Sequence, residues 1–104
     1  MNNSIYFANA RSEDGYIRYF ISAPTEIVCR SVITNQLKCM HDSEYLITEE
    51  EIENKTTKTL KDLLDMFYIT EIGVANEKFN VIGLLYKETG FYNKEYVFDI
   101  DDFE

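Results

Sequence analysis

The sequence contains few of the residues from which most catalytic and metal sites are built. It has one histidine, two cysteines, one proline, four glycines and no tryptophan. The glycines are scattered, and none falls in a G-x-G-x-x-G or G-x-x-x-x-G-K-[ST] phosphate-binding pattern. His41 lies two residues after Cys39, a spacing that points side chains apart on a helix, and a structural zinc site needs four ligands. We therefore expect no catalytic residues, no metal and no cofactor.

Long apolar runs are also missing. No stretch of about 18 apolar residues is present, so the sequence predicts no membrane-spanning helix. The first ten residues, MNNSIYFANA, lack the basic and apolar regions of a secretory signal. Two cysteines are too few for a disulfide framework. Together these absences predict a cytoplasmic protein with reduced thiols.

Basic residues are absent from two parts of the chain, which carry all of the excess negative charge. The chain has 19 acidic and 10 basic residues, a net charge of −9. Residues Asp42–Glu53 hold six acids and residues Glu95–Glu104 hold five, without a base in either window. The rest of the chain holds eight acids and ten bases. The sequence therefore describes a nearly neutral body with two acidic segments.

The two acidic segments indicate what kind of partner the protein can bind. Nucleic-acid binding needs a basic surface that releases counterions from phosphate, and an anionic membrane would repel acidic segments. A cationic protein surface, by contrast, would be attracted, and its encounter rate would rise. We expect a basic protein partner, with no direct nucleic-acid contact and no membrane contact.

The strand signals lie at the two ends of the chain. Residues 4–10 and 16–22 are rich in Ile, Tyr and Phe and flank Asp14-Gly15, a pattern typical of a hairpin. The last third predicts three more strands over residues 68–75, 78–87 and 91–100, separated by turns at 76–77 and 88–90. Residues 78–87 are apolar on both faces, so we expect this strand to be central.

Two helices are expected between these groups of strands. Cys29, Ile33, Leu37 and Met40 form one apolar stripe, which predicts a helix over residues 25–40. Thr48 and Glu51 match a capping box at the start of a second helix. Residues 54–59, NKTTKT, are weak helix formers, and we expect one helix over about 49–67 rather than two short ones.

These elements predict a single domain over residues 1–104. Its class is α+β, with an antiparallel sheet of about five strands, two helices on one face, and the order ββααβββ. The pattern contains no internal repeat and no linker, and it does not predict an oligomeric state.

Candidate binding residues come from the acidic windows and the tyrosines beside them. Glu49–Glu51 have a second explanation, because carboxylates in a first helical turn are stabilised by the helix dipole. The window Glu95–Glu104 lacks that explanation, and tyrosine is enriched at interface hot spots. The predicted partner-binding residues are Glu44, Tyr45, Glu49, Glu50, Glu53, Tyr92, Glu95, Asp99, Asp101 and Asp102.

The function expected from these features is inhibition by binding. The most concrete form is an immunity protein that neutralises a basic bacterial nuclease toxin, because such a toxin has a cationic substrate cleft. A phage-encoded inhibitor that mimics nucleic acid, directed at a host nuclease or a CRISPR effector, makes the same charge prediction. A small enzyme or ligand-binding domain is the third possibility, and an enclosed pocket with convergent polar groups would distinguish it.

Overall fold

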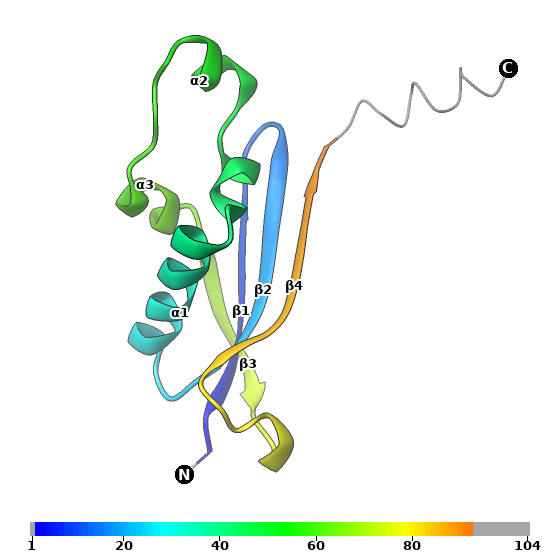
Figure 1. Ribbon diagram of the computed structural model, residues 1–104. Coiled ribbons are helices and arrows are strands. Elements are labelled where there is room, and N and C mark those ends of the chain that lie inside the picture. The colour runs from blue at the N-terminus through cyan, green and yellow to red at the C-terminus, as the bar shows by residue number, and fades with distance from the viewer. Residues whose placement is uncertain (1, 93–104) are drawn as a thin grey trace, which may run out of the picture.

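The computed structural model describes residues 2–92, which form an α+β fold with one antiparallel four-stranded sheet (Figure 1). The strand order across the sheet is β3-β1-β2-β4. In chain order the elements are β1 (Ser4–Arg11), β2 (Gly15–Ala23), α1 (Glu26–Cys39), the 3₁₀ helix η1 (Asp42–Leu46), α2 (Glu49–Glu53), α3 (Leu60–Asp65), β3 (Tyr68–Val74), the 3₁₀ helix η2 (Glu77–Phe79) and β4 (Gly83–Phe91). Among these residues, no helix has both the length and the apolar character needed to cross a bilayer.

The predicted N-terminal hairpin is confirmed. β1 and β2 pair from Ser4 opposite Ala23 to Arg11 opposite Tyr16. The Ser12 hydroxyl accepts hydrogen bonds from the backbone N–H groups of Asp14 and Gly15, both at 3.1 Å, and so holds the turn. Gly15 is required here, because a Cβ atom would lie 2.5 Å from the backbone oxygen of Tyr45.

The first predicted helix is also confirmed as α1. Thr25 caps its N-terminus by accepting a hydrogen bond from the Val28 N–H. The core contains Cys29, Ile33 and Leu37 of the predicted stripe. Met40, the fourth member of the stripe, is 52% exposed because it is the C-cap residue.

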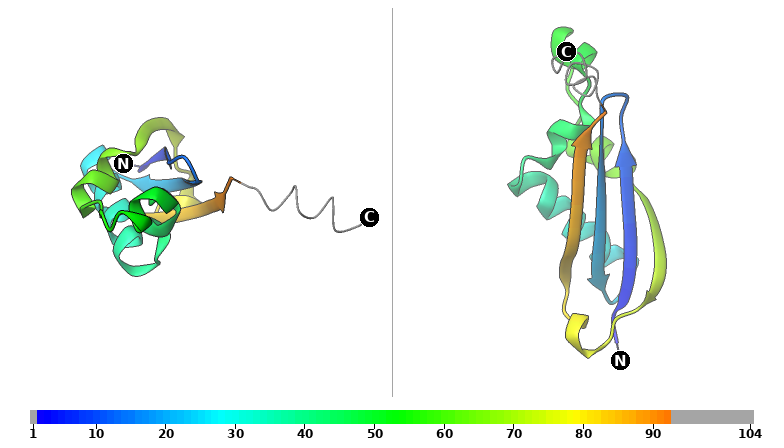
Figure 2. Two further views of the ribbon diagram at one scale, coloured as in Figure 1. Left: turned by 90° about the horizontal axis from the view of Figure 1, so that it is seen from above. Right: turned by 90° about the vertical axis from the view of Figure 1, so that its right-hand side faces the viewer.

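One face of the sheet packs against α1. The buried side chains of this face alternate along the two central strands: Tyr6, Ala8 and Ala10 on β1, and Ile17, Tyr19, Ile21 and Ala23 on β2. α1 and α3 lie on this side, and within residues 2–92 no helix covers the opposite face of the sheet (Figure 2). The prediction of helices on one face of an antiparallel sheet is confirmed.

The number and arrangement of the C-terminal strands differ from the prediction. Within residues 2–92 the sheet has four strands, and the predicted strand 78–87 is not central. Residues 75–82 instead pass beneath the start of β1, where Asn80 Oδ1 accepts from the Asn3 N–H at 2.6 Å and the Ala75 N–H donates to the Asn3 oxygen at 2.8 Å. This connection places β3 and β4 at opposite edges of the sheet.

The predicted turn at 88–90 is likewise wrong, because these residues lie inside β4. Gly90 suggested a turn, but it pairs with Tyr16 in the sheet. Its missing side chain makes room for the Tyr16 ring, which would lie 2.9 Å from a Cβ atom. Of the predicted strand 91–100, only Phe91 and Tyr92 lie among the described residues.

The second predicted helix is two short helices, so the ββααβββ order also fails at this point. α2 ends because Lys55 adopts a left-handed conformation, with φ 57°, and the Thr56 N–H donates back to the Glu51 oxygen. Thr59 then begins α3 with a second capping box to Asp62. The weak segment 54–59 breaks the helix rather than bending it, and α2 projects past the end of the sheet (Figure 1).

Candidate binding site

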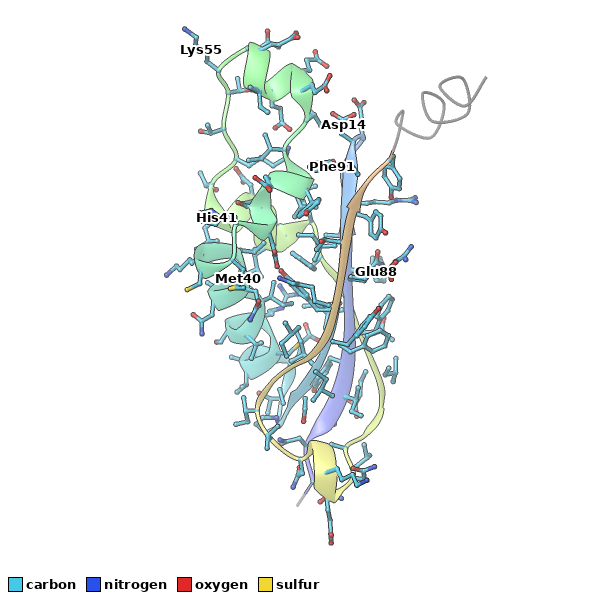
Figure 3. All side chains as sticks on the ribbon, turned by 45° about the vertical axis from the view of Figure 1, so that its right-hand side comes forward. Asp14, Met40, His41, Lys55, Glu88 and Phe91 are labelled. Carbon is cyan, nitrogen blue, oxygen red and sulfur yellow. The ribbon has the colours of Figure 1, made fainter. Side chains whose placement is uncertain are left out.

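A hollow of about 400 Å³ lies where the projecting α2 segment faces the end of β4. Three parts of the chain line it: the β1–β2 turn, the segment from η1 to α2, and the end of β4. Figure 3 shows two of the labelled lining residues, Asp14 and Phe91, near one another at this end of the sheet. The lining residues, which we call the acidic hollow, are Asp14, Glu44, Ile47, Glu49, Ile52, Phe91 and Tyr92.

Asp14 connects the other two parts of the acidic hollow. Its carboxylate accepts a hydrogen bond from the Glu49 N–H at 2.9 Å, at the first residue of α2. Its backbone oxygen accepts from the Tyr92 N–H at 2.8 Å, just after β4. One residue of the hairpin turn therefore sets the position of both α2 and Tyr92.

Aromatic packing supports the floor of the hollow. The Tyr45 and Phe91 rings lie with their centroids 4.6 Å apart. The Ser12 hydroxyl donates to the Tyr45 oxygen at 3.1 Å, and Gly15 allows that oxygen to approach the hairpin. η1, which contributes Glu44 to the hollow, is thereby attached to both β2 and β4.

The acidic residues of α2 have different roles. Glu51 is partly buried, completes the capping box with Thr48, and pairs with Lys58 across the break between α2 and α3. The hydrogen bond from Lys58 is the main reason that the pKa of Glu51 is lowered, and the capping hydrogen bonds from Thr48 lower it further. Glu51 therefore holds the segment together, and exposed Glu49, Glu50 and Glu53 supply the surface charge of α2.

Apolar surface accompanies this charge. Ile52 is 66% exposed, Phe91 48% and Tyr92 42%, all in the lining of the hollow. Single exposed apolar side chains are ordinary, but a group of them beside carboxylates is typical of an interaction site. The arrangement suits a basic side chain with an apolar stem, or a basic residue next to an apolar one.

Asp42, although it belongs to the acidic window, is not part of the surface. It is 3% exposed, and its Oδ2 accepts a hydrogen bond from the Tyr19 hydroxyl at 2.6 Å. Lys87 Nζ lies 3.2 Å from Oδ1, so β4 is joined to η1 by an ion pair. Asp42 therefore holds the fold and leaves five acids in this window for the surface or for Lys58.

The structure brings together only some of the predicted binding residues. Glu44, Glu49 and Tyr92 line the acidic hollow, and half-buried Tyr45 supports it through Phe91. Glu50 and Glu53 are exposed on α2 outside the hollow. The predicted residues Glu95, Asp99, Asp101 and Asp102 lie outside the described residues.

Sequence reasoning missed Asp14, Ile47, Ile52 and Phe91. The sequence indicates only a turn at Asp14, and nothing local indicates that this turn meets α2. Ile52 fits the apolar stripe of the predicted helix over 49–67, and its exposure follows from the end of α2 at Glu53.

Metal-ligating side chains do not gather in the part of the chain that the structure describes. Among residues 2–92, no three histidine, cysteine, aspartate or glutamate side chains are placed to hold a metal ion. His41 follows the C-cap of α1, is exposed and has a positive φ of 58°, as expected of a residue at a helix end. Comparisons of the chain with protein-family models, with curated proteins and with solved structures found no match.

Proposed function

We propose that this protein is a binding protein whose acidic hollow receives a basic, partly apolar segment of a partner protein. The observation that carries the proposal is that Asp14, Glu44 and Glu49 line one hollow together with exposed Ile52 and Phe91. The carboxylates would speed the encounter with a cationic surface, and the apolar side chains would slow dissociation.

The more specific form of the proposal is an immunity protein that neutralises a basic nuclease toxin in the cytoplasm. A nuclease cleft is lined by cations that contact phosphate, and an acidic projection can occupy or neighbour such a cleft. α2 projects past the sheet and has carboxylates at its exposed positions, so it has the shape and charge for this role (Figure 1).

One feature favours a protein contact over mimicry of a nucleic acid. The carboxylates of the hollow and of α2 gather at one end of the domain, around a five-residue helix. A nucleic-acid mimic needs charges spaced along a line that matches successive phosphates, one for about every 3.4 Å of helix axis on each strand. The clustered arrangement fits one basic anchor better than a long phosphate-like track.

Affinity capture from the native host tests the proposal when it is done with matched variants. The wild-type chain should capture a basic protein that the double variant Glu44→Lys/Glu49→Lys does not capture. Glu77→Lys, an exposed carboxylate of η2 at the far end of the sheet, is the control and should capture the same protein as the wild type. Circular dichroism confirms that the variants are folded. Equal capture by wild type and double variant would refute the proposal.

A further inference from the structure

A second hollow, of about 340 Å³, has the opposite chemistry to the first. Its polar lining contains two arginines and no carboxylate, although the protein as a whole carries a net charge of −9. Four of the lining residues lie on the face of β1 and β2 that no helix of the described chain covers (Figure 2). We call this site the arginine hollow; it is lined by Asn9, Ala10, Arg11, Tyr16, Arg18, Met66, Tyr68 and Tyr92.

The two arginines are neighbours on the uncovered face. Arg11 pairs with Tyr16 and Asn9 with Arg18 in the β1–β2 register, so Arg11 and Arg18 lie on a diagonal between adjacent strands. Such diagonal side chains have Cα atoms about 7–8 Å apart, within reach of a common ligand.

Both guanidinium groups have donors to spare. Arg18 lies over the Tyr16 ring, 4.7 Å from its centroid, and makes one ion pair, to Glu88 at 3.3 Å. Figure 3 shows Glu88 on the side of the sheet away from Met40 and His41, which mark the helix side. Arg11 is exposed, and its side chain has no ion pair or hydrogen bond within residues 2–92. A guanidinium has five N–H donors, so this pair can bind carboxylates without giving up the Glu88 contact.

We propose that the arginine hollow binds the acidic segment Glu95–Glu104 of the same chain. The segment has five carboxylates, no base and several aromatic or branched apolar residues, which complement two arginines and three tyrosines. Tyr92 itself lines the hollow and packs on Tyr16, with ring centroids 5.6 Å apart. The segment therefore begins only three residues from the site.

The distance across the sheet is compatible with this binding. From β4 to β1 the chain must pass two strand spacings of about 4.8 Å each. Arg18 pairs with Glu88, four residues before Tyr92, so the chain must also turn back by about 13 Å along the strands. Three extended residues of about 3.3 Å each, together with the lengths of the two side chains, bring a carboxylate at Glu95 to Arg18, and seven residues bring Asp99 past Arg11. The charge of the segment and the length of chain available both allow this binding. An external acidic peptide would have to compete with a segment that is tethered at the site.

The arginine hollow shares only Tyr92 with the acidic hollow, and this inference does not require that a partner binds to the acidic hollow. It gives the C-terminal acidic window a role other than the partner contact expected from the sequence. It also predicts that the uncovered face of the sheet is partly shielded from solvent in the full chain.

A double-mutant cycle on the full chain tests the proposal. The first change is Arg11→Gln/Arg18→Gln, and the second is Glu95→Gln/Asp99→Asn. We expect each change to raise the unfolding equilibrium constant, measured in urea. In the combined variant this constant should be about 2- to 5-fold lower than the value obtained by multiplying the two separate increases. The Arg18–Glu88 pair is lost whenever the arginines are replaced, with or without the second change, so its loss cancels in the cycle. Effects that simply multiply would overturn the proposal.

The control cycle replaces the arginine change with Arg30→Gln, because Arg30 pairs with Glu26 on α1, on the other side of the sheet. Its effect should multiply with that of Glu95→Gln/Asp99→Asn without any coupling. Coupling of the same size in this control would show a general charge effect, and it would also overturn the proposal.

A spin label provides a test that does not depend on stability. The label is placed at Ile100→Cys in a Cys39→Ser background, since Cys39 is the exposed thiol of the described chain. We expect the NMR signals of Tyr16 and Tyr68 to be broadened at low protein concentration while those of α2 are not. Unbroadened tyrosine signals, or broadening seen only when labelled and unlabelled chains are mixed at high concentration, would show that the segment does not bind within its own chain.

Discussion

The Tyr19 hydroxyl donates a 2.6 Å hydrogen bond to the Asp42 carboxylate, and both side chains are buried. Lys87 of β4 forms an ion pair with the same carboxylate, so Asp42 connects β2, η1 and β4. The η1 segment carries Glu44 and Tyr45 to the acidic hollow, so the buried carboxylate lies beneath the candidate site and supports it.

Removing this carboxylate should destabilise the protein strongly. Asp42→Ala leaves a buried hydroxyl and a half-buried ammonium without their acceptor, and we expect a loss of about 2–4 kcal/mol in the free energy of unfolding. Asp65→Ala, at an exposed position of α3, is the matched control and should change it by less than about 0.5 kcal/mol. Urea unfolding measures both. A small effect at Asp42 would mean that the network does not hold η1.

Alkaline pH should weaken the fold through Tyr19. Burial raises the pKa of Tyr19, and the hydrogen bond to Asp42 raises it further. The unfolded chain ionises this tyrosine near pH 10, so above that pH unfolding releases a proton and becomes more favourable. The contribution of Tyr19 is therefore full below about pH 9 and should fall by about 1.4 kcal/mol per pH unit above about pH 10.

The variant Tyr19→Phe isolates this contribution. Its free energy of unfolding should depend less on pH between 9 and 11 than that of the wild type, whereas exposed Tyr68→Phe should follow the wild type. Urea titrations at several pH values give the slopes. Parallel slopes for wild type and Tyr19→Phe would contradict the assignment.

Gly15 should tolerate no side chain. Gly15→Ala places a Cβ atom 2.5 Å from the Tyr45 oxygen and 3.0 Å from the Gly90 oxygen, both backbone atoms that cannot rotate away. We expect a loss of about 1–3 kcal/mol or more. Gly73→Ala, in β3, meets no atom within 4 Å and should be close to neutral. Thermal unfolding compares the two, and equal melting temperatures would contradict the close packing of η1 on the hairpin.

Glycine should be stabilising at Lys55. This residue ends α2 with a φ of 57°, a conformation that costs a residue with a Cβ atom about 1 kcal/mol. Lys55→Gly should therefore raise the free energy of unfolding by up to about 1 kcal/mol, although a lysine is lost. Lys61→Gly, within α3, should lower it by a similar amount. Effects of the same sign would rule out the left-handed end of α2.

The parts of the fold that depend on local signals were predictable from the sequence. The apolar stripe of α1, its stop after Met40, and the hairpin around Asp14-Gly15 each follow from neighbouring residues. The crossing from β3 to β4 did not, because it depends on Asn80 meeting Asn3 from the other end of the chain. The turn predicted at Gly90 is also wrong because of a distant residue: the ring of Tyr16 fills the space that a side chain at position 90 would occupy.

The candidate site was predictable only in its charge. Glu44 and Glu49 stand out in the sequence as members of an acidic window, but their meeting with Asp14 and Phe91 is a tertiary contact. The segment NKTTKT indicates a weak point in the predicted helix over 49–67, and the chain breaks there because Thr59 and Asp62 form a second capping box.

The salt dependence of partner association tests most directly whether the acidic hollow binds a basic surface. Stopped-flow association of the captured partner with the wild-type chain should slow by about 10-fold or more as salt screens the carboxylates. The variant Glu44→Lys/Glu49→Lys should associate slowly at low salt and change little as salt rises, whereas Glu77→Lys should behave as the wild type does. A low-salt association rate that is the same for wild type and double variant would contradict the account.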